Sequence, residues 1–308
     1  MRMISMSTLV SALILLILHT PLLYSKPLKV HILSGQSNMS GYGDYKSGAY
    51  QPNPKVDQQI PYFYHVDTKF GSRGSGGKSE TIQTLDTYRI RENGRNTYSA
   101  NTPHSNGRWG VELAFARTLS TESKDKHGII KIAEGGTGLA NRWDSQPAPD
   151  GSDRFSACWK MWVEQTTKAL SLLKKEGYEV DIASIVWTQG ENDTNNKTAA
   201  FAYEKNFLRL INAMYNHLNS LGYPTNETVF INNSFSHSKL ARMIDQQEVR
   251  RAQKAVMNAI PNGFYHDNSE LNEPKHYRDK VHYNGASLIT MGENMALGYL
   301  EYKQKQAE

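Results

Sequence analysis

The chain has 308 residues, of which 38% are hydrophobic and 21% are charged, and these proportions are typical of a globular protein with one large core. The formal net charge is only +5 at pH 7 and the basic residues are scattered along the chain, which argues against a nucleic-acid-binding protein. The one cysteine excludes an internal disulfide, so the fold must be stabilised by its packed interior.

The N-terminus has the order of a secretory signal, because Arg2 precedes an uncharged apolar stretch at residues 9–18 and polar residues follow. That stretch is too short to span a hydrocarbon layer of about 30 Å. We therefore predict a signal peptide over residues 1–25, a secreted protein, and a single domain over residues 26–308. Because Leu23 fits poorly with the small residues of a cleavage site, an uncleaved signal that anchors the protein to a membrane is the alternative.

Beyond the signal, short runs rich in valine and isoleucine alternate with longer segments of helical period. This alternation predicts an α/β fold, with a parallel sheet covered by helices on both faces. The expected strands are residues 29–33, 129–133, 182–187 and 228–232. The expected helices are residues 111–122, 156–176, 199–221, 246–259 and 286–302. Glycine often ends a helix, and glycines stand at or just past three of these helix ends, namely Gly128, Gly177 and Gly222.

A long insertion at residues 44–106 interrupts the alternation and is rich in glycine, serine, asparagine and tyrosine. Loops of this length are usually functional or disordered. The insertion begins shortly after the first expected strand, and α/β sheets bind ligands at the carboxyl ends of their strands. We expect it to form either a wall of the substrate site or a mobile surface loop.

A serine follows the first expected strand, in Ser34-Gly35-Gln36-Ser37. A serine at this position is exposed where a ligand would bind. Met39 replaces the second glycine of the G-x-S-x-G pattern, so the nucleophile elbow of an α/β-hydrolase is disfavoured. From these residues alone, Ser37 could equally be the N-cap of a helix.

Asp279 and His282 precede the last expected helix and can face one pocket from a single loop. A serine hydroxyl needs a base to take its proton, and the imidazole of that base needs a carboxylate to orient it. Ser37, Asp279 and His282 supply these three groups. Judged by spacing alone, however, the Asp-His pair is more simply explained as a surface ion pair.

Three motifs occur together and in chain order, namely Gly35-Gln36-Ser37-Asn38-Met39, Gln189-Gly190-Glu191-Asn192-Asp193 and the late D-x-x-H pair. Two further blocks accompany them, Trp109-Gly110-Val111-Glu112-Leu113 and the segment 132–139, with Trp143 shortly after. From residue 29 to about residue 290, the chain thereby resembles the carbohydrate esterase family 6 and sialate O-acetylesterase group of the SGNH hydrolases. The resemblance implies a three-layer α/β/α sandwich with a central parallel sheet, which is a flavodoxin-like fold.

The resemblance also implies roles for individual residues. Ser37 would be the nucleophile, His282 the base that later protonates the leaving alcohol, and Asp279 the group that orients His282. The oxyanion hole, which stabilises the charge that develops on the carbonyl oxygen, would consist of the backbone N–H groups of Ser37 and Gly110 and the side chain of Gln189. Because the wider superfamily has a G-x-N-D motif here, Asn192 is the alternative to Gln189.

Six further residues could contact the substrate or support the catalytic groups, and these are Gln36, Asn38, Glu112, Glu191, Asn192 and Trp143. Glu191 could assist Asp279, although tying its own loop to neighbouring segments is the simpler role. Trp143 could be a stacking platform for a sugar or a core aromatic residue. Cys158 lies on an apolar helix face and is predicted to be packed rather than catalytic. The histidines lack the spacing of a metal site.

These observations lead to a hypothesis in which a serine esterase removes acetyl groups from a carbohydrate through an acyl-enzyme, without metal or organic cofactor. The acetyl and carbohydrate parts rest on the resemblance alone. Acetylated polysaccharides such as xylan and O-acetylated sialic acid are the candidate substrates, and no nucleic acid and no stable protein partner are expected. The alternatives are a lipase-like or aryl esterase of the same superfamily and a noncatalytic glycan-binding protein of the same fold.

Overall fold

The computed structural model describes residues 25–43, 53–68, 77–85, 109–147 and 155–308, and only the backbone of residues 88–90 and 96–98. The predicted signal, apart from Ser25, lies outside the described residues. In the part of the chain from residue 25 onward that is described, none of the helices combines the length and hydropathy that a membrane span requires.

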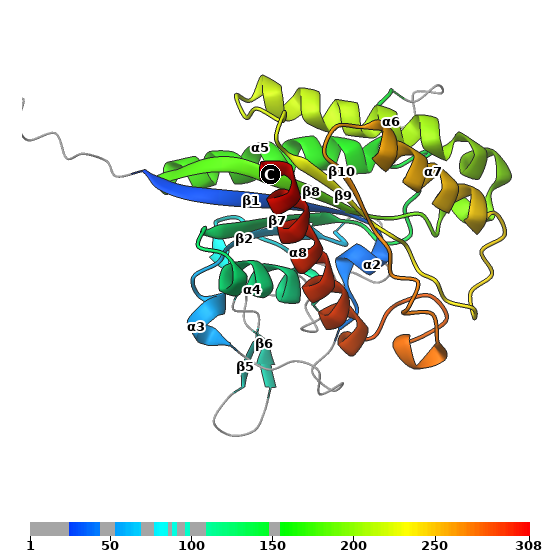
Figure 1. Ribbon diagram of the computed structural model, residues 1–308, viewed down its shortest axis with the longest axis horizontal. Helices are drawn as coiled ribbons and strands as arrows, with labels where there is room; N and C mark the ends of the chain where they lie inside the picture. The colour runs from blue at the N-terminus through cyan, green and yellow to red at the C-terminus, as the bar shows by residue number, and fades with distance from the viewer. Residues whose placement is uncertain are drawn as a thin grey trace, which may run out of the picture.

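A mostly parallel sheet forms the centre of the molecule (Figure 1), and its strand order is β10-β9-β8-β1-β7-β2-β3, with β4 also paired to β2. The parallel strands are β1 (Lys26–Gly35), β2 (Pro61–Val66), β7 (His127–Ala133), β8 (Tyr178–Thr188), β9 (Val229–Asn233) and β10 (Gly263–His266). Two short strands pair antiparallel with β2, and these are β3 (Gly77–Lys78) and β4 (Gln83–Thr84). A separate hairpin is made of β5 (Tyr88–Ile90) and β6 (Asn96–Tyr98).

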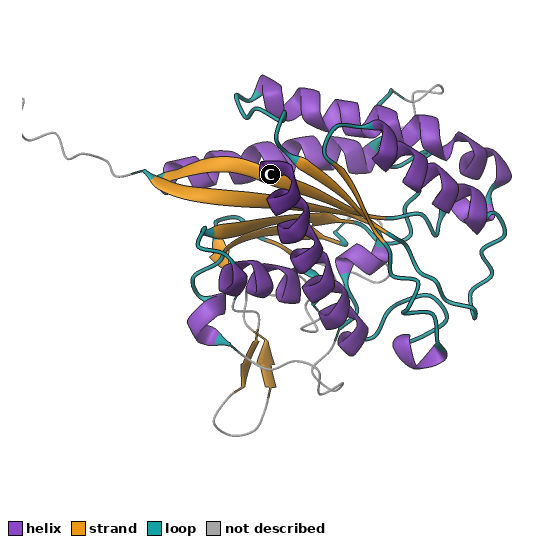
Figure 2. Cartoon of the chain, in the orientation of Figure 1, coloured by secondary structure: helices purple, strands orange, loops and turns teal. Residues whose placement is uncertain are grey.

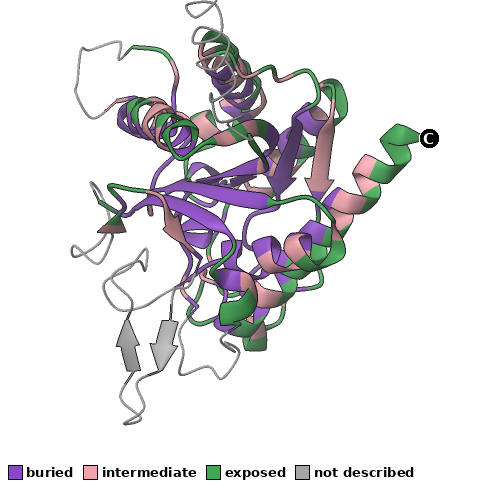
Figure 3. Ribbon diagram, turned by 90° about the vertical axis from the view of Figure 1, so that its left-hand side faces the viewer, coloured by how far each residue is buried: buried purple, intermediate pink, exposed green. Residues whose placement is uncertain are grey.

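Helices cover both faces of the sheet (Figure 2), which confirms the predicted three-layer α/β/α architecture. One face carries α5 (Ala157–Lys175), α6 (Lys197–Ser220) and α7 (Gln246–Ala259). The other carries α4 (Glu112–Glu122) and α8 (Gly285–Ala307). Each layer contributes to its own cluster of buried apolar side chains, so the sheet in Figure 3 is buried between two cores. Cys158 is fully buried in the first core, as predicted.

The predicted strands and helices are all present, with ends that differ by a few residues. Of the parallel strands, β2 and β10 were not predicted, and neither were the four short strands β3 to β6. Strand β10 has only four residues, and β2 lies inside the stretch that was expected to be a loop, where a buried aromatic run is surrounded by polar sequence. Gly177 and Gly222 follow α5 and α6 in left-handed conformation, but the prediction for Gly128 was wrong. Helix α4 ends at Glu122 with Ser123 as its C-cap, and Gly128 lies further on, inside β7.

Strand β1 lies between β7 and β8, so the chain leaves it towards one side of the sheet and later crosses to the other. Ligands of open α/β sheets bind at the carboxyl ends of the strands at such a switch point. Gly35, the last residue of β1, passes so close to β8 that an added Cβ would lie 2.0 Å from the Thr188 carbonyl oxygen. Only glycine fits there, and the residues that follow it are thereby held against β8.

Two histidines are buried at the opposite end of the sheet from this switch point. His31 Nε2 lies 3.0 Å from His127 Nδ1, and the chain of polar contacts continues at both ends to serine hydroxyls, Ser184 at 2.7 Å and Ser123 at 2.9 Å. Burial lowers the pKa of His31 well below its usual value and lowers the pKa of His127 to about 4. Both rings are therefore neutral in the folded protein at neutral pH.

These two histidines make the fold sensitive to acid. An unfolded histidine has a pKa near 6.5, so the unfolded chain binds more protons than the folded chain between about pH 6.5 and pH 4, and folding is less favourable there. We predict that the free energy of unfolding in urea falls between pH 7 and about pH 5, and that His127→Gln reduces this fall by about 1 kcal/mol. An equal fall in both proteins would contradict the assignment.

Candidate active site

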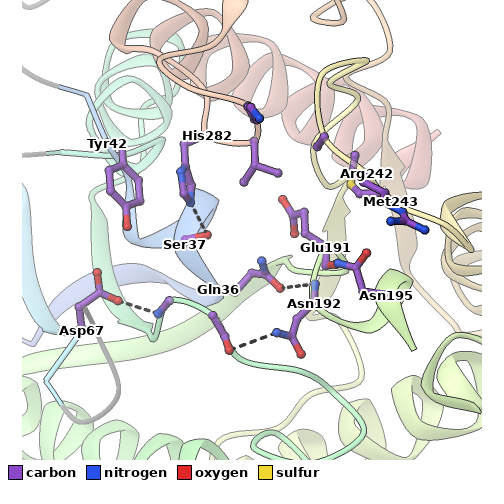
Figure 4. A pocket seen from close by; sticks show the side chains of 15 residues that line it. Gln36, Ser37, Tyr42, Asp67, Glu191, Asn192, Asn195, Arg242, Met243 and His282 are labelled. Carbon is purple, nitrogen blue, oxygen red and sulfur yellow. Dashed lines mark hydrogen bonds between the residues drawn. The ribbon is translucent and has the colours of Figure 1, made fainter. Parts of the chain in front are cut away.

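A pocket of about 530 Å³ opens at the carboxyl ends of the central strands. Ser37 and His282 line it together with residues from several other loops (Figure 4). Asp67, which directly follows β2, is one of them. The insertion expected at residues 44–106 thus contributes to the wall of this pocket through Asp67, while residues 44–52, 69–76, 86–87, 91–95 and 99–106 lie outside the described part.

Ser37 is the first residue of the short helix α2 (Ser37–Ser40), which directly follows β1. Its Oγ lies 3.0 Å from His282 Nε2. The N-cap of α2 is Gln36, so the alternative in which Ser37 itself caps the helix is wrong. The Ser37 backbone N–H lies in the first turn, where N–H groups have no partner within the helix.

Asp279 and His282 lie in the loop before α8, and the structure brings both to Ser37. Asp279 Oδ2 lies 2.8 Å from His282 Nδ1, and Asp279 Oδ1 accepts the backbone N–H groups of Val281 and His282, each at 2.8 Å. Burial by itself would raise the pKa of Asp279, but these donors outweigh it and hold the pKa below its usual value. A carboxylate at Nδ1 places the ring proton there, so Nε2 is left to accept the Ser37 hydroxyl proton.

Asn38 links the serine to the histidine loop. Its Nδ2 donates to Glu191 Oε1 at 2.5 Å and to the Val281 carbonyl at 3.3 Å, while its Oδ1 accepts the Tyr283 backbone N–H at 3.2 Å. Since Asn38 is 1% exposed, water does not compete for these bonds. The side chain therefore sets the position of α2 relative to the loop that carries His282.

Glu191 connects loops, which is the simpler of its two predicted roles. Besides Asn38, its Oε1 accepts the Ser236 backbone N–H at 3.1 Å. The hydrogen bonds of Asp279 go to its own loop and to His282 rather than to Glu191. Gln36 is a second connector, since its Oε1 accepts Gln189 Nε2 at 3.2 Å and the Asn192 backbone N–H at 3.3 Å.

Two predicted oxyanion donors do not line the pocket. The Gly110 N–H donates to Glu112 Oε1 at 3.0 Å. Gln189 is fully buried, and its Nε2 donates to Asp193 Oδ2 at 2.6 Å and to the Thr137 carbonyl at 3.2 Å. Both groups are therefore engaged in internal hydrogen bonds, and the sequence-based assignment of Gly110 and Gln189 is corrected.

Other donors do reach the pocket beside Ser37. Asn192, the alternative to Gln189, is exposed and lines it, and one of its two Nδ2 hydrogens is used by the Gly136 carbonyl at 3.3 Å. Gly136 also lines the pocket, in left-handed conformation. Gly135 holds this loop in place, because its N–H donates to Asp67 Oδ1 at 2.7 Å and an added Cβ would lie 3.5 Å from Ser37 Cβ.

A buried ion pair lies behind helix α2. Lys131 Nζ is 2.7 Å from Glu112 Oε2, with both side chains 0% exposed, and it also donates to the Ser40 carbonyl at 2.9 Å. Burial lowers the pKa of Lys131, although the Glu112 carboxylate acts in the opposite direction. Glu112 is thus a support for α2 rather than a contact for substrate.

Trp143 is a core residue. It is fully buried, its ring packs edge-on against Trp187, and its Nε1 donates to the Thr137 hydroxyl at 2.8 Å. The alternative in which it stacks on a sugar is therefore wrong.

Across the described ranges, no group of three or more histidine, cysteine or acidic side chains is arranged to hold a metal ion.

Sequence reasoning did not single out several residues that line the pocket, namely Tyr42, Asp67, Gly136, Arg242 and Lys280. Gly136 was within a recognised block, and its left-handed conformation is what the double glycine indicates. Asp67 is also left-handed, with φ 49°, and its Oδ1 accepts the Ser40 hydroxyl at 2.9 Å. The polar sequence around Asp67 carries no pattern that would reveal this backbone conformation.

Comparisons with known proteins identify the family and the fold. The family model described as carbohydrate esterase, sialic acid-specific acetylesterase, matches residues 27–301. A solved structure of a protein from Arabidopsis thaliana is 20% identical, with a TM-score of 0.58 over 90% of this chain and 98% of that one. The structure of NanS is 15% identical, with a TM-score of 0.56 over 91% and 99%. At these identities the two structures show the shared fold alone. No curated protein matches the chain.

Proposed function

The chain belongs to the carbohydrate esterase family of sialic acid-specific acetylesterases, and we propose that it removes acetyl groups from a carbohydrate with Ser37 as the nucleophile. The observation that carries this proposal is the relay from Ser37 Oγ to His282 Nε2 at 3.0 Å and from His282 Nδ1 to Asp279 Oδ2 at 2.8 Å. Both are hydrogen-bond distances, so His282 Nε2 can take the Ser37 proton while Asp279 orients the imidazole without being protonated itself.

The proposed reaction has two steps. Ser37 Oγ attacks the acetyl carbonyl while His282 Nε2 takes its proton, and this proton then passes to the alcohol oxygen of the sugar as the ester bond breaks. A water molecule gives a proton to His282 and attacks the acetyl-serine. The bond between the acetyl carbon and Ser37 Oγ then breaks, His282 returns the proton to Oγ, and the acetyl group leaves as acetic acid, which ionises to acetate. Asp279 keeps the imidazole in the required tautomer and stabilises its charged form.

The oxyanion hole is proposed to consist of the backbone N–H groups of Ser37 and Gly136 and the side-chain amide of Asn192. Support comes from the hydrogen-bond inventory, because an amide has two N–H hydrogens and only one of those on Asn192 is used, by the Gly136 carbonyl. The Gly136 N–H makes no hydrogen bond to any residue in the described part of the chain.

An acidic sugar is favoured over a neutral one by the charges around the pocket. Two carboxylates line the pocket, those of Asp67 and Glu191. One oxygen of each accepts two internal hydrogen bonds. The two lining cations, Arg242 and Lys280, are exposed and make no ion pair with the described residues. Since guanidinium and ammonium groups bind carboxylates, we infer that the substrate carries one, as sialic acid does.

The first test removes the nucleophile and the base. Ser37→Ala and His282→Ala are each expected to lower acetate release from 4-nitrophenyl acetate, acetylated xylan and O-acetylated sialic acid by at least roughly a hundredfold, with unchanged melting temperatures. Full activity in either variant would rule out the serine mechanism. Binding of acetylated glycans without any acetate release by the wild type would favour the noncatalytic protein, and a preference for long acyl chains would favour the lipase-like esterase.

The second test separates the two candidates for the oxyanion hole. Loss of one preorganised donor typically costs about 10²- to 10³-fold in kcat. Asn192→Ala is expected to lower kcat to that degree and to leave the melting temperature unchanged, because its side chain is exposed. Gln189→Ala is the matched control and should lower the melting temperature, because it removes buried hydrogen bonds. A normal kcat in Asn192→Ala would refute the assignment.

The third test concerns the charge of the substrate. Arg242→Gln is expected to lower kcat/KM for O-acetylated sialic acid by roughly tenfold and to change kcat/KM for neutral acetylated xylan by less than about twofold. Lys239→Gln, at a nearby lysine that pairs with Glu273 and does not line the pocket, is the control. Equal effects of Arg242→Gln on both substrates would contradict the preference for an acidic sugar.

A further inference from the structure

The ring of Tyr42 stacks on the ring of His282. The two ring centroids are 4.2 Å apart and the planes are inclined by 30°. The guanidinium carbon of Arg278 lies 5.4 Å from the centroid of the same tyrosine ring. Tyr42 therefore contacts the histidine loop at two points, on either side of Asp279, and it also lines the pocket (Figure 4).

The backbone on both sides of Tyr42 is fixed against a neighbouring segment. Gly41 is left-handed, and an added Cβ there would lie 2.4 Å from Gly110 Cα. Gly43 forms an isolated β-bridge with Trp109, with hydrogen bonds of 3.0 and 3.1 Å. Since Trp109 is fully buried, Tyr42 is presented from a rigid support rather than from a free loop.

The imidazole of His282 needs such a support. Its carboxylate partner Asp279 has a side chain that is 48% exposed, so solvent weakens that contact. A flat ring in contact with the imidazole blocks its rotation away from Ser37. In addition, the electron-rich face of an aromatic ring attracts a positive charge, and His282 becomes positively charged when it takes the serine proton.

We propose that Tyr42 is a positioning residue that holds His282 Nε2 towards Ser37 and stabilises the imidazolium. The proposal rests on the proposed function of His282 as the base. The charged groups around the ring pair and its pocket come from four segments. Arg278, Asp279 and Lys280 belong to the histidine loop, Asp67 follows β2, Glu191 lies in the loop after β8 and Arg242 in the loop before α7. The stacked ring, and not the phenol hydroxyl, is the part of Tyr42 that acts.

The test compares Tyr42→Leu, which removes the ring but keeps apolar volume, with Tyr42→Phe, which keeps the ring. On 4-nitrophenyl acetate, Tyr42→Leu is expected to lower kcat about fivefold to tenfold with KM changed by less than about twofold, and Tyr42→Phe is expected to stay within about twofold of wild type. Tyr42→Met serves as a second ringless variant if the leucine variant does not fold.

Tyr299→Leu is the matched control, because Tyr299 contacts a histidine edge-on, His31, far from the pocket. It should lower the melting temperature and leave kcat unchanged. A normal kcat in both ringless variants would overturn the proposal, as would a raised KM with an unchanged kcat, which would make Tyr42 a wall for substrate. A loss in Tyr42→Phe equal to that in Tyr42→Leu would also overturn it. Full activity of Ser37→Ala would instead refute the serine mechanism itself.

Discussion

The hydrogen bonds of one buried amide, Asn38, hold the candidate active site together. Ser37, the proposed nucleophile, lies just past the end of the central strand, and His282, the proposed base, lies in the loop before the last helix, 245 residues later. Asn38 is covalently next to Ser37, and it bonds to the loop after β8 and to the histidine loop. Because a buried amide without its partners is costly, these three segments have one favourable arrangement. The separation of 3.0 Å between Ser37 and His282 is a consequence of that arrangement.

A second set of buried polar groups supports helix α2, which begins with Ser37. Lys131 on β7 holds the last carbonyl of α2 and pairs with Glu112, which in turn holds the Gly110 N–H. A buried ion pair adds little net stability, because desolvation offsets its Coulomb attraction. Its contribution here is directional, since a charge bonded on both sides fixes where α2 and α4 meet. Tyr42 follows directly on this junction, so the support reaches the histidine ring.

The sequence predicted the fold well because its strongest signals are local. Apolar runs and helical periods identified the central strands and all five long helices, and the family match confirms the resemblance drawn from the serine and Q-G-E motifs. Ser37, Asp279 and His282 each lie in a short motif, which is why the sequence could point to them as a triad. The geometry brings them together, and their roles stay predictions.

The oxyanion donors and Trp143 show where sequence reasoning ends. A motif says that an amide is near the site, but not whether its hydrogens are already used. Gln189 is taken up by Asp193, while Asn192, three residues further along the chain, reaches the pocket. Likewise an indole after a glycine-rich loop can face a sugar or the core, and only the packing against Trp187 decides. Such choices depend on long-range contacts, and β2 was missed for the same reason.

The position of β1 also bears on how the protein is made. The strand that leads to Ser37 lies inside the sheet, and both strands that flank it, β7 and β8, follow much later in the chain. During translation its two hydrogen-bonding edges stay open, which is a hazard for aggregation. The histidine is synthesised 245 residues after the serine. Under the proposed mechanism, a nascent chain therefore carries an inert Ser37 hydroxyl, and the capacity to cleave an ester arises only when synthesis has passed the loop that contains His282.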